Sequence, residues 1–242
     1  LLTKRFDGTV LRSAIRGMEA ADCGASVLLR CGSGECWDDV VEHAVSNGWY
    51  GAENLSIIPG DVGASAVQNI GAYGVEAKDI IHSIEALDIA TAEPRVFTAE
   101  ECNYSYRYSR FKDEWKGQYV ITHVTYRLSK TFVPHTSYGN IQAELDSRGI
   151  SVPTARDVRD VIIGIRNAKL PDPKVEGNAG SFFMNPVVDA AFYEQLAAKY
   201  PGMPHYQAGE GKVKIPAGWL IDQCGWKGRV LGKAGVHSEQ AL

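Results

Sequence analysis

The glycine-rich segment at residues 57–74 constrains the fold of this chain more than any other part. Its four glycines alternate with small or amide side chains, so little bulk separates the backbone from a neighbour. Glycine lets the main chain approach a partner closely and adopt positive φ, and successive exposed N–H groups suit anionic groups. A turn-rich connector has a similar composition. The apolar residues Ile58, Val62, Val67 and Ile70 favour a packed ligand-binding loop instead.

Length and composition describe an ordinary globular chain of one large or two modest domains. The net charge of −4 argues against a general nucleic-acid binder. No apolar run approaches the ~20 residues that span a bilayer. The chain begins without an initiator Met or a signal-peptide pattern, so we expect a cytoplasmic fragment of a longer protein.

The cysteines and histidines indicate no metal site. Five cysteines without a dense framework suggest reduced thiols. Cys31 and Cys36 are spaced like a metal pair, but no second pair has zinc-type spacing. His123 and His237 are expected to be structural.

The first half of the chain is predicted to mix strands with one helix. A strand at 25–30 precedes a helix that Ser33 caps and Gly48 closes. One apolar face of that helix is expected to be buried: Trp37, Val40, Val41, Ala44 and Val45. Strands follow at 84–89 and 119–128. The second is expected to turn one face inward, although Ile121 breaks its alternation; the inward residues are Val120, Val124, Tyr126 and Leu128.

Helices dominate the predicted second half. After a loop at 131–140, Thr154 caps a helix that runs to Lys169, where the prolines of 170–173 stop it. Its apolar residues at helical spacing are Val158, Val161, Ile162 and Ile165. A helix at 189–200 is expected to turn Phe192, Leu196 and Tyr200 inward, and Pro216 begins a short helix that runs to Gly225.

Four blocks carry a family resemblance. They lie at 59–74, 106–112, 169–186 and 217–224 and include the runs QNIGAYG, YRYSRFK, GNAGSFFMNP and AGWLIDQC. In this order they resemble the UDP-N-acetylenolpyruvoylglucosamine reductase family, and they cover most of the chain. The resemblance implies an α+β flavoprotein. An FAD-binding domain of the PCMH/vanillyl-alcohol-oxidase type is expected at 1–130, with its N-terminal part missing. A smaller α+β substrate-binding domain is expected at 131–242, with its C-terminal end missing.

The activity implied by this resemblance is reduction of UDP-N-acetylglucosamine enolpyruvate to UDP-N-acetylmuramate in peptidoglycan precursor synthesis. NADPH reduces FAD, and the flavin N5 hydride then passes to the enolpyruvyl β-carbon. Two alternatives remain open: a non-catalytic sugar-nucleotide-binding module, and another flavoprotein oxidase on the same fold. We expect a monomer without nucleic-acid or membrane partners.

Two side chains match the family's catalytic positions. Arg107 corresponds to the arginine that grips the substrate carboxylate while enolate charge builds. Ser181 corresponds to the proton donor, and Phe182-Phe183 are expected to hold its hydroxyl in a dry pocket. The two are expected to meet, from separate lobes, at the reactive edge of the flavin.

Further positions match binding residues of the family. Those matching flavin contacts are Pro59, Gly60, Gly63, Ser65, Gln68, Asn69, Gly71, Ala72, Tyr73, Gly74 and Ile121. Those matching contacts to the UDP sugar are Tyr138, Arg166, Lys169, Asn185 and Gln240. The family's glycine-rich phosphate loop and catalytic glutamate have no counterpart in this sequence. The 242 residues alone are therefore expected to bind FAD poorly and to turn over little.

Overall fold

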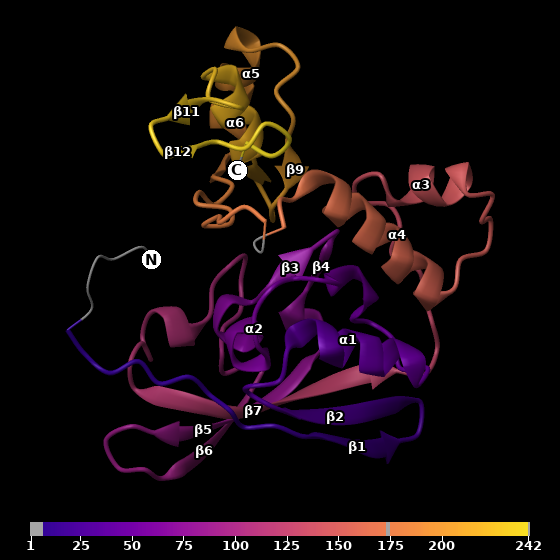
Figure 1. The fold of residues 1–242 in the computed structure, drawn as a ribbon, viewed down its shortest axis with the longest axis vertical. Helices are drawn as coiled ribbons and strands as arrows, with labels where there is room; N and C mark the ends of the chain where they lie inside the picture. Colours follow the sequence, from indigo (N-terminus) through magenta and orange to yellow (C-terminus); the bar gives the residue numbers. More distant parts are fainter. Residues whose placement is uncertain (1–6, 173–174, 242) are drawn as a thin grey trace. The chain divides into compact units, whose positions relative to one another are not determined.

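The computed structural model describes residues 7–172 and 175–241. It divides into two compact units, one ending at Arg166 and the other beginning at Asn167 (Figure 1). Each unit is described by itself. The domain boundary expected near residue 130 stays a prediction. Pro173 and Lys174, which belong to one family block, lie outside the described residues.

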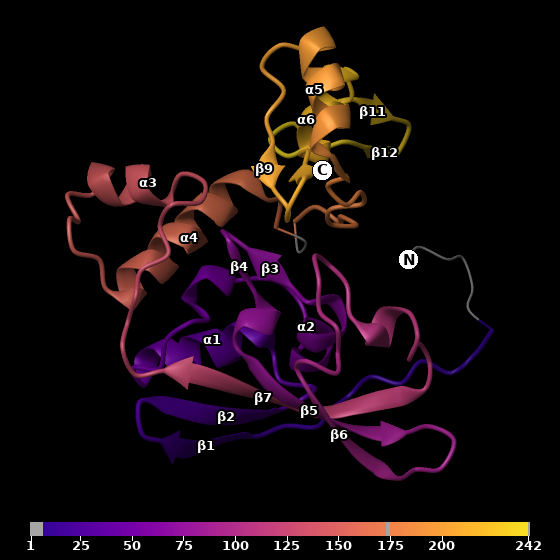
Figure 2. The same cartoon turned by 180° about the vertical axis from the view of Figure 1, so that it is seen from behind.

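A five-stranded antiparallel sheet forms the base of the larger unit (Figures 1 and 2). Its strands lie in the order β1-β2-β7-β5-β6. Their bounds are Met18–Cys23 for β1, Ser26–Gly32 for β2, Tyr119–Ser129 for β7, Ile81–Asp88 for β5 and Pro94–Thr98 for β6. The predicted strands at 25–30, 84–89 and 119–128 are therefore confirmed to within a few residues.

Helices α1 (Trp37–Ser46) and α2 (Val62–Gln68) cover one face of this sheet (Figure 1). The five residues predicted to share the inner face of α1 are all buried. Ser33 is not its cap, because Cys36 occupies the N-cap position. A capping side chain must belong to the residue next to the first helical turn. The Ser33 hydroxyl instead lies 2.7 Å from the Ser13 hydroxyl.

A bulge corrects the predicted alternation of β7. Glu85 pairs with His123, but Ala86 pairs with Ile121, so β7 carries one extra residue, Thr122, at this point. One extra residue turns every side chain beyond it to the opposite face. Val120 consequently points outward and is 48% exposed, whereas Ile121 is buried. The other three inward predictions for this strand are confirmed.

A helical pair supplies a second core within the larger unit. Helix α3 spans Ile141–Ser147, and α4 spans Ala155–Lys169, which confirms the predicted helix. Thr154 and Asp157 cap α4 reciprocally, since each backbone N–H donates to the other's side chain. The remaining short elements of this unit are η1 (Glu53–Leu55), β3 (Gly71–Ala72), β4 (Val75–Glu76), η2 (Ala77–Asp79) and η3 (Arg110–Lys112).

The smaller unit has short elements. A sheet in the order β8-β10-β9 combines Val187–Asp189, Lys212–Lys214 and Tyr206–Gln207. Helices α5 and α6 span Ala190–Lys199 and Ala217–Gln223, and the hairpin β11–β12 pairs Val230–Leu231 with Ala234–Gly235. Its buried apolar residues are Met203, Val213, Ile215, Ala217 and Ala241.

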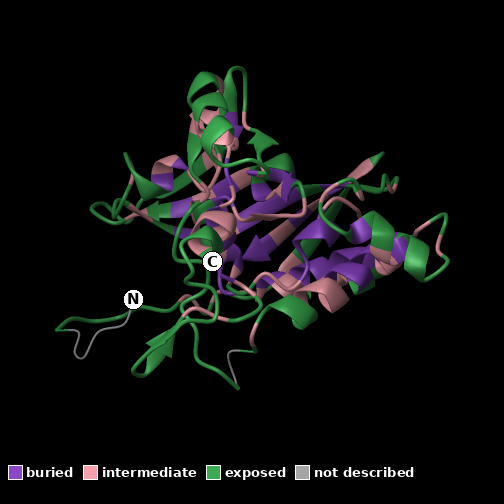
Figure 3. Cartoon of the chain, turned by 90° about the horizontal axis from the view of Figure 1, so that it is seen from above, coloured by how far each residue is buried: buried purple, intermediate pink, exposed green. Residues whose placement is uncertain are grey.

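The predicted α5 exists, but its predicted inner face is wrong. Phe192 and Tyr200 are 49% and 52% exposed, and no residue of α5 is buried. The small core is built mainly around β10 and the start of α6, so α5 has little apolar surface to cover. Figure 3 shows most of this unit as exposed or intermediate, whereas buried residues fill the sheet and helices of the larger one. Among the described residues, no helix is both long and apolar enough to cross a membrane.

Candidate functional site

The glycine-rich segment 57–74 folds as a turn, helix α2, strand β3 and the turn that leads into β4. Three of its non-glycine residues have positive φ: Ile57 (48°), Asn69 (46°) and Tyr73 (48°). Side chains rarely adopt this region, and such residues gather where structure is imposed for binding or catalysis. Arg107 shares the feature, with φ of 56°. The segment is thus a strained loop that its surroundings hold in place.

Two of the predicted flavin residues use their side chains inside the protein. The buried Asn69 amide donates to Glu76 Oε2 and to the Ser105 carbonyl, both at 2.8 Å, and accepts from the Lys78 N–H at 2.9 Å. The Ser65 hydroxyl lies 2.7 Å from both the Val62 carbonyl and the Tyr126 hydroxyl. Both side chains therefore fix the path of the loop.

Arg107 lies directly against this loop. Its Nη1 donates to the Asn69 carbonyl at 3.2 Å, and its Nη2 donates to the Gly71 carbonyl at 2.6 Å. A Cβ on Gly71 would lie 3.0 Å from Arg107 Nη1, so any larger residue here would push the guanidinium away from the loop. The half-buried guanidinium has no ion-pair partner among the described residues. It has five N–H donors, so it can also bind an anion.

Arg166 contacts the loop at a second place. Its Nη2 donates to the Ile57 carbonyl at 3.4 Å, and its side chain lies close enough to the Tyr73 phenol for the two groups to affect each other's pKa. Its buried Nε has no hydrogen-bond partner. Burial lowers the pKa of Arg166 and raises that of Tyr73. A partly desolvated cation with an unused donor is a favourable site for an anion.

The loop at 131–140, which contains Tyr138, packs on the same segment. A Cβ on Gly74 would lie 3.3 Å from Tyr138 Cβ, and one on Gly139 would lie 3.6 Å from the Tyr73 ring. The buried Asn54 amide donates to the carbonyls of Tyr73 at 3.0 Å and His135 at 2.8 Å. The structure thus brings Tyr138, Tyr73 and Gly74 together, and the expected contact of Tyr138 with the UDP sugar stays a prediction.

A hollow of about 360 Å³ opens beside α2. Of the predicted flavin residues, Gly63 and Ile121 line it. The others differ in exposure: Pro59, Gly60, Gln68 and Gly74 are exposed, whereas Gly71, Ala72 and Tyr73 are half-buried. The wall also contains residues that sequence reasoning missed, notably Ser13, Ser33, Phe111, Trp115 and Tyr119. For Phe111, Trp115 and Tyr119, the many aromatic residues at 104–119 could have indicated a place in the wall of a binding site.

In the smaller unit the predicted site residues are more exposed. Ser181 and Lys169 are exposed, and Gln240 is half-buried. The dry pocket expected around Ser181 is wrong, because Phe182 and Phe183 are 80% and 58% exposed. These aromatic rings contact each other, with centroids 5.1 Å apart, rather than covering the serine.

Asn185 has a local structural partner. Its Oδ1 accepts from the Ala217 N–H at 2.8 Å, at the first residue of α6. Its amide therefore helps to anchor the start of that helix. The expected meeting of Arg107 and Ser181 would join the two units, and it stays a prediction.

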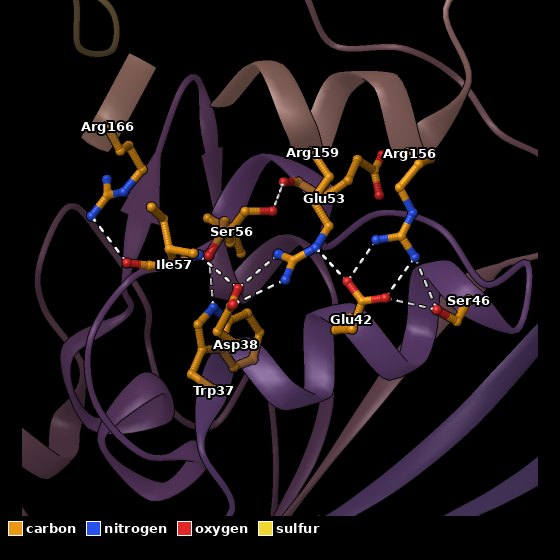
Figure 4. A network of polar contacts seen from close by, with 11 residues as sticks. Trp37, Asp38, Glu42, Ser46, Glu53, Ser56, Ile57, Arg156, Arg159 and Arg166 are labelled. Atoms are coloured by element: carbon orange, nitrogen blue, oxygen red, sulfur yellow. Dashed lines mark hydrogen bonds and ion pairs between the residues drawn. The ribbon is translucent and has the colours of Figure 1, made fainter. Parts of the chain in front are cut away.

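A network of charged side chains, which the sequence analysis missed, joins α1 to α4 (Figure 4). Arg159 makes paired contacts to Asp38 at 2.7 and 2.9 Å and donates to Glu42 at 2.8 Å. Arg156 donates twice to Glu42, both at 2.6 Å. The hydrogen bond from Arg156, stronger than the opposing effect of burial, lowers the pKa of Glu42 to about 2. The sequence did contain a signal for this network. Asp38 and Glu42 are four residues apart and so share one face of α1, and Arg156 and Arg159 are three residues apart and so share one face of α4.

Comparisons with known proteins agree along the whole chain. A family model described as an FAD binding domain matches residues 2–99, and one described as the C-terminal domain of UDP-N-acetylenolpyruvoylglucosamine reductase matches 172–242. A reductase of that name from Bacteroides fragilis is 52% identical over 244 residues, covering 100% of this chain and 72% of the relative. One from Porphyromonas gingivalis is 49% identical, also covering 100% of this chain and 72% of the relative.

A solved structure supports the fold. The crystal structure of UDP-N-acetylenolpyruvylglucosamine reductase from Thermus caldophilus matches with a TM-score of 0.58 and 22% identity. The match covers 88% of this chain and 59% of the solved one. The chain thus spans well under the full length of the proteins that it resembles.

Proposed function

The chain belongs to the UDP-N-acetylenolpyruvoylglucosamine reductase family, the flavin oxidoreductases of peptidoglycan precursor synthesis, and we propose that its residues serve that reaction. The reaction is the NADPH-dependent reduction of UDP-N-acetylglucosamine enolpyruvate to UDP-N-acetylmuramate. Identity of 52% over the entire chain is the observation that carries this proposal.

The larger unit offers residues that fit FAD. The hollow beside α2 has an aromatic and apolar side, with Phe111, Trp115 and Ile121, and a polar side with Ser13 and Ser33. Such a wall suits a planar ring with polar edges. Gly63 lines the hollow and packs closely against Ser33, because a Cβ there would lie 3.1 Å from the Ser33 side chain. Bound FAD would supply a hydride, which NADPH replenishes.

Arg107 would bind the substrate carboxylate. The carbonyls of Asn69 and Gly71 hold its guanidinium in one orientation, and its other N–H groups can donate to an anion. A guanidinium held in advance stabilises developing negative charge without reorganising during the reaction. Arg107 would therefore stabilise the enolate that forms when the double bond is reduced.

Ser181 would deliver the proton that completes the reduction. The Asn178 side chain accepts from the Gly180 N–H at 3.1 Å, which shapes the turn just before the serine. Arg166 and Lys169, on the last turn of α4, would neutralise the substrate diphosphate, while Tyr138, Asn185 and Gln240 would contact the rest of the UDP sugar.

The test uses the full-length holoenzyme. Purified protein should show a flavin absorbance spectrum, and its NADPH oxidation should depend on the enolpyruvyl sugar. NADPH oxidation that needs only oxygen would favour the oxidase alternative, and protein without flavin would favour the binding module.

Replacing Ser181 by alanine tests the assignment of the proton donor. The variant should keep reduction of its flavin by NADPH and lose turnover by about 10²–10⁴-fold, the usual value of a positioned acid. The exposed Ser151 provides a matched control, and Ser151→Ala should leave both rates unchanged. Full turnover by Ser181→Ala would contradict the role.

A further inference from the structure

The backbone of Ile57 is held at both its N–H and its carbonyl at the start of the glycine-rich segment (Figure 4). Its N–H donates to Asp38 Oδ1 at 2.7 Å, and its carbonyl accepts from Arg166 at 3.4 Å. Ile57 has φ of 48°, which is an outlier for a β-branched residue. A conformation of this kind persists only where its surroundings impose it. Asp38 and Arg166 are the two side chains in position to do so.

Asp38 also binds helix α4. The same Oδ1 accepts from Arg159 Nη1 at 2.7 Å, and Oδ2 accepts from Arg159 Nη2 at 2.9 Å. The Arg159 side chain is only 5% exposed. Burial alone would raise the pKa of Asp38, but hydrogen bonds from Arg159 and the Ile57 N–H outweigh it and lower the net pKa. One ionised carboxylate therefore joins a strained peptide to a buried arginine.

Arg159 and Arg166 lie on the same side of α4. They are seven residues apart, which is two helical turns or about 10 Å. Arg159 meets Asp38, and Arg166 meets the carbonyl of Ile57, the residue whose N–H donates to Asp38. The contacts thus form a closed loop through Asp38, Ile57, Arg166 and Arg159. A shift of α4 along its axis would break at least one of them.

We propose that Asp38, through Arg159 and the Ile57 peptide, is a positioning residue that presents Arg166 to the diphosphate of the UDP sugar. This inference rests on the proposed function, because it assumes that Arg166 binds the substrate. The Arg166 guanidinium makes one long hydrogen bond, to the Ile57 carbonyl at 3.4 Å, and no ion pair among the described residues, so it keeps terminal N–H donors for an anion but is weakly held. Fixing the helix and the adjoining carbonyl restricts the long side chain before substrate arrives.

The experiment compares Asp38→Asn with Arg156→Met in the full-length holoenzyme. Asp38→Asn should raise KM for the enolpyruvyl sugar about tenfold and change kcat much less, since it disturbs binding rather than chemistry. Arg156 belongs to the same network but does not contact Ile57. Arg156→Met should therefore leave KM unchanged, even where it lowers the melting temperature.

Coupling between Asp38 and Arg166 separates positioning from general damage. Arg166→Gln should weaken UDP binding in calorimetric titrations about tenfold in the native background. In the Asp38→Asn background it should weaken binding less than about threefold, because contacting residues are not additive. Arg159→Lys should recover part of the affinity that Arg159→Met loses. Equal effects of Arg166→Gln in both backgrounds would overturn the proposal.

A local measurement separates this inference from the proposed function. Hydrogen exchange of the Ile57 amide should speed up in Asp38→Asn and stay unchanged in Arg156→Met. Unsubstituted holoenzyme that fails to reduce the enolpyruvyl sugar would refute the proposed function. Normal turnover together with additive variants or an unchanged Ile57 amide would refute only the positioning role of Asp38.

Discussion

Two small-residue segments carry most of the candidate site, and the structure treats them differently. In 57–74, the residues Ser65 and Asn69 are buried and fully engaged, and Arg107 binds the main chain. In 177–186, Ser181 and its two aromatic neighbours are exposed and the turn before the serine is held locally, while only the end of the segment, at Asn185, binds a distant residue. Similar composition therefore gives a rigid loop where a core surrounds it and an open one where it does not.

The asparagines should show the largest contrast in stability. Asn69→Ala removes three hydrogen bonds from a fully buried side chain, leaves a cavity in its place and puts alanine at φ of 46°. We expect a loss of about 3–4 kcal/mol in the free energy of unfolding, measured by urea denaturation. Asn178→Ala, in the exposed segment, should cost less than about 0.5 kcal/mol. Equal losses would remove the distinction between the segments.

The serines should show the next largest effect. Ser65→Ala leaves the fully buried Tyr126 hydroxyl without its partner, so a loss of about 1–3 kcal/mol is expected. Ser181→Ala should leave the melting temperature unchanged, because its side chain is exposed. Thermal unfolding of the two variants compares them directly. A stable Ser65→Ala protein would show that the loop does not depend on this contact.

The glycines test how closely each segment is packed. A Cβ at Gly71 would lie 3.0 Å from three atoms, including Arg107 Nη1, whereas one at Gly177 would meet nothing within 4 Å. Gly71→Ala should cost about 1–2 kcal/mol and weaken substrate binding by displacing the guanidinium. Gly177→Ala should be neutral or stabilise by up to about 1 kcal/mol. Urea unfolding and KM measured together would show whether Arg107 moved.

The smallest expected effect is on the stability of the protein at acidic pH, and it depends on the ion pairs of Glu42 with α4. The folded pKa of Glu42 is about 2, against an ordinary 4.5, so its ion pairs stabilise the protein fully above the unfolded value. That contribution falls as the pH drops from about 4.5 towards 2. Glu42→Gln should therefore flatten the decline of the urea midpoint over this range. The effect should be modest and weaker in high salt, because the Glu42 side chain is 44% exposed.

Sequence patterns were sufficient where local periodicity controls the outcome. The inner face of α1, the cap and end of α4, and the strand β2 follow directly from apolar spacing, Thr154 and the proline run. Ser33 was assigned to the wrong role, because its partner, Ser13, lies twenty residues away in sequence. The outward turn of Val120 was also missed, since the bulge depends on how β7 pairs with β5.

In the candidate site, too, local sequence motifs were predictable and contacts between distant segments were not. The resemblance located the strained loop and its glycines, but it did not reveal that Asn69 and Ser65 face inward. Nor did it locate Asp38, Arg159 or Asn54, which hold neighbouring segments together. These residues come from separate parts of the chain, and no local pattern marks them as partners.

The order of residues by itself determined the family, the flavin chemistry and most helices and strands, because short-range spacing and motif identity encode them. Tertiary structure alone decided which polar side chains stabilise the loop and which remain available to a ligand. The reason is physical: a hydrogen bond or ion pair depends on burial and on the distance between segments. Both are settled only when the sheet, its helices and the α4 network assemble.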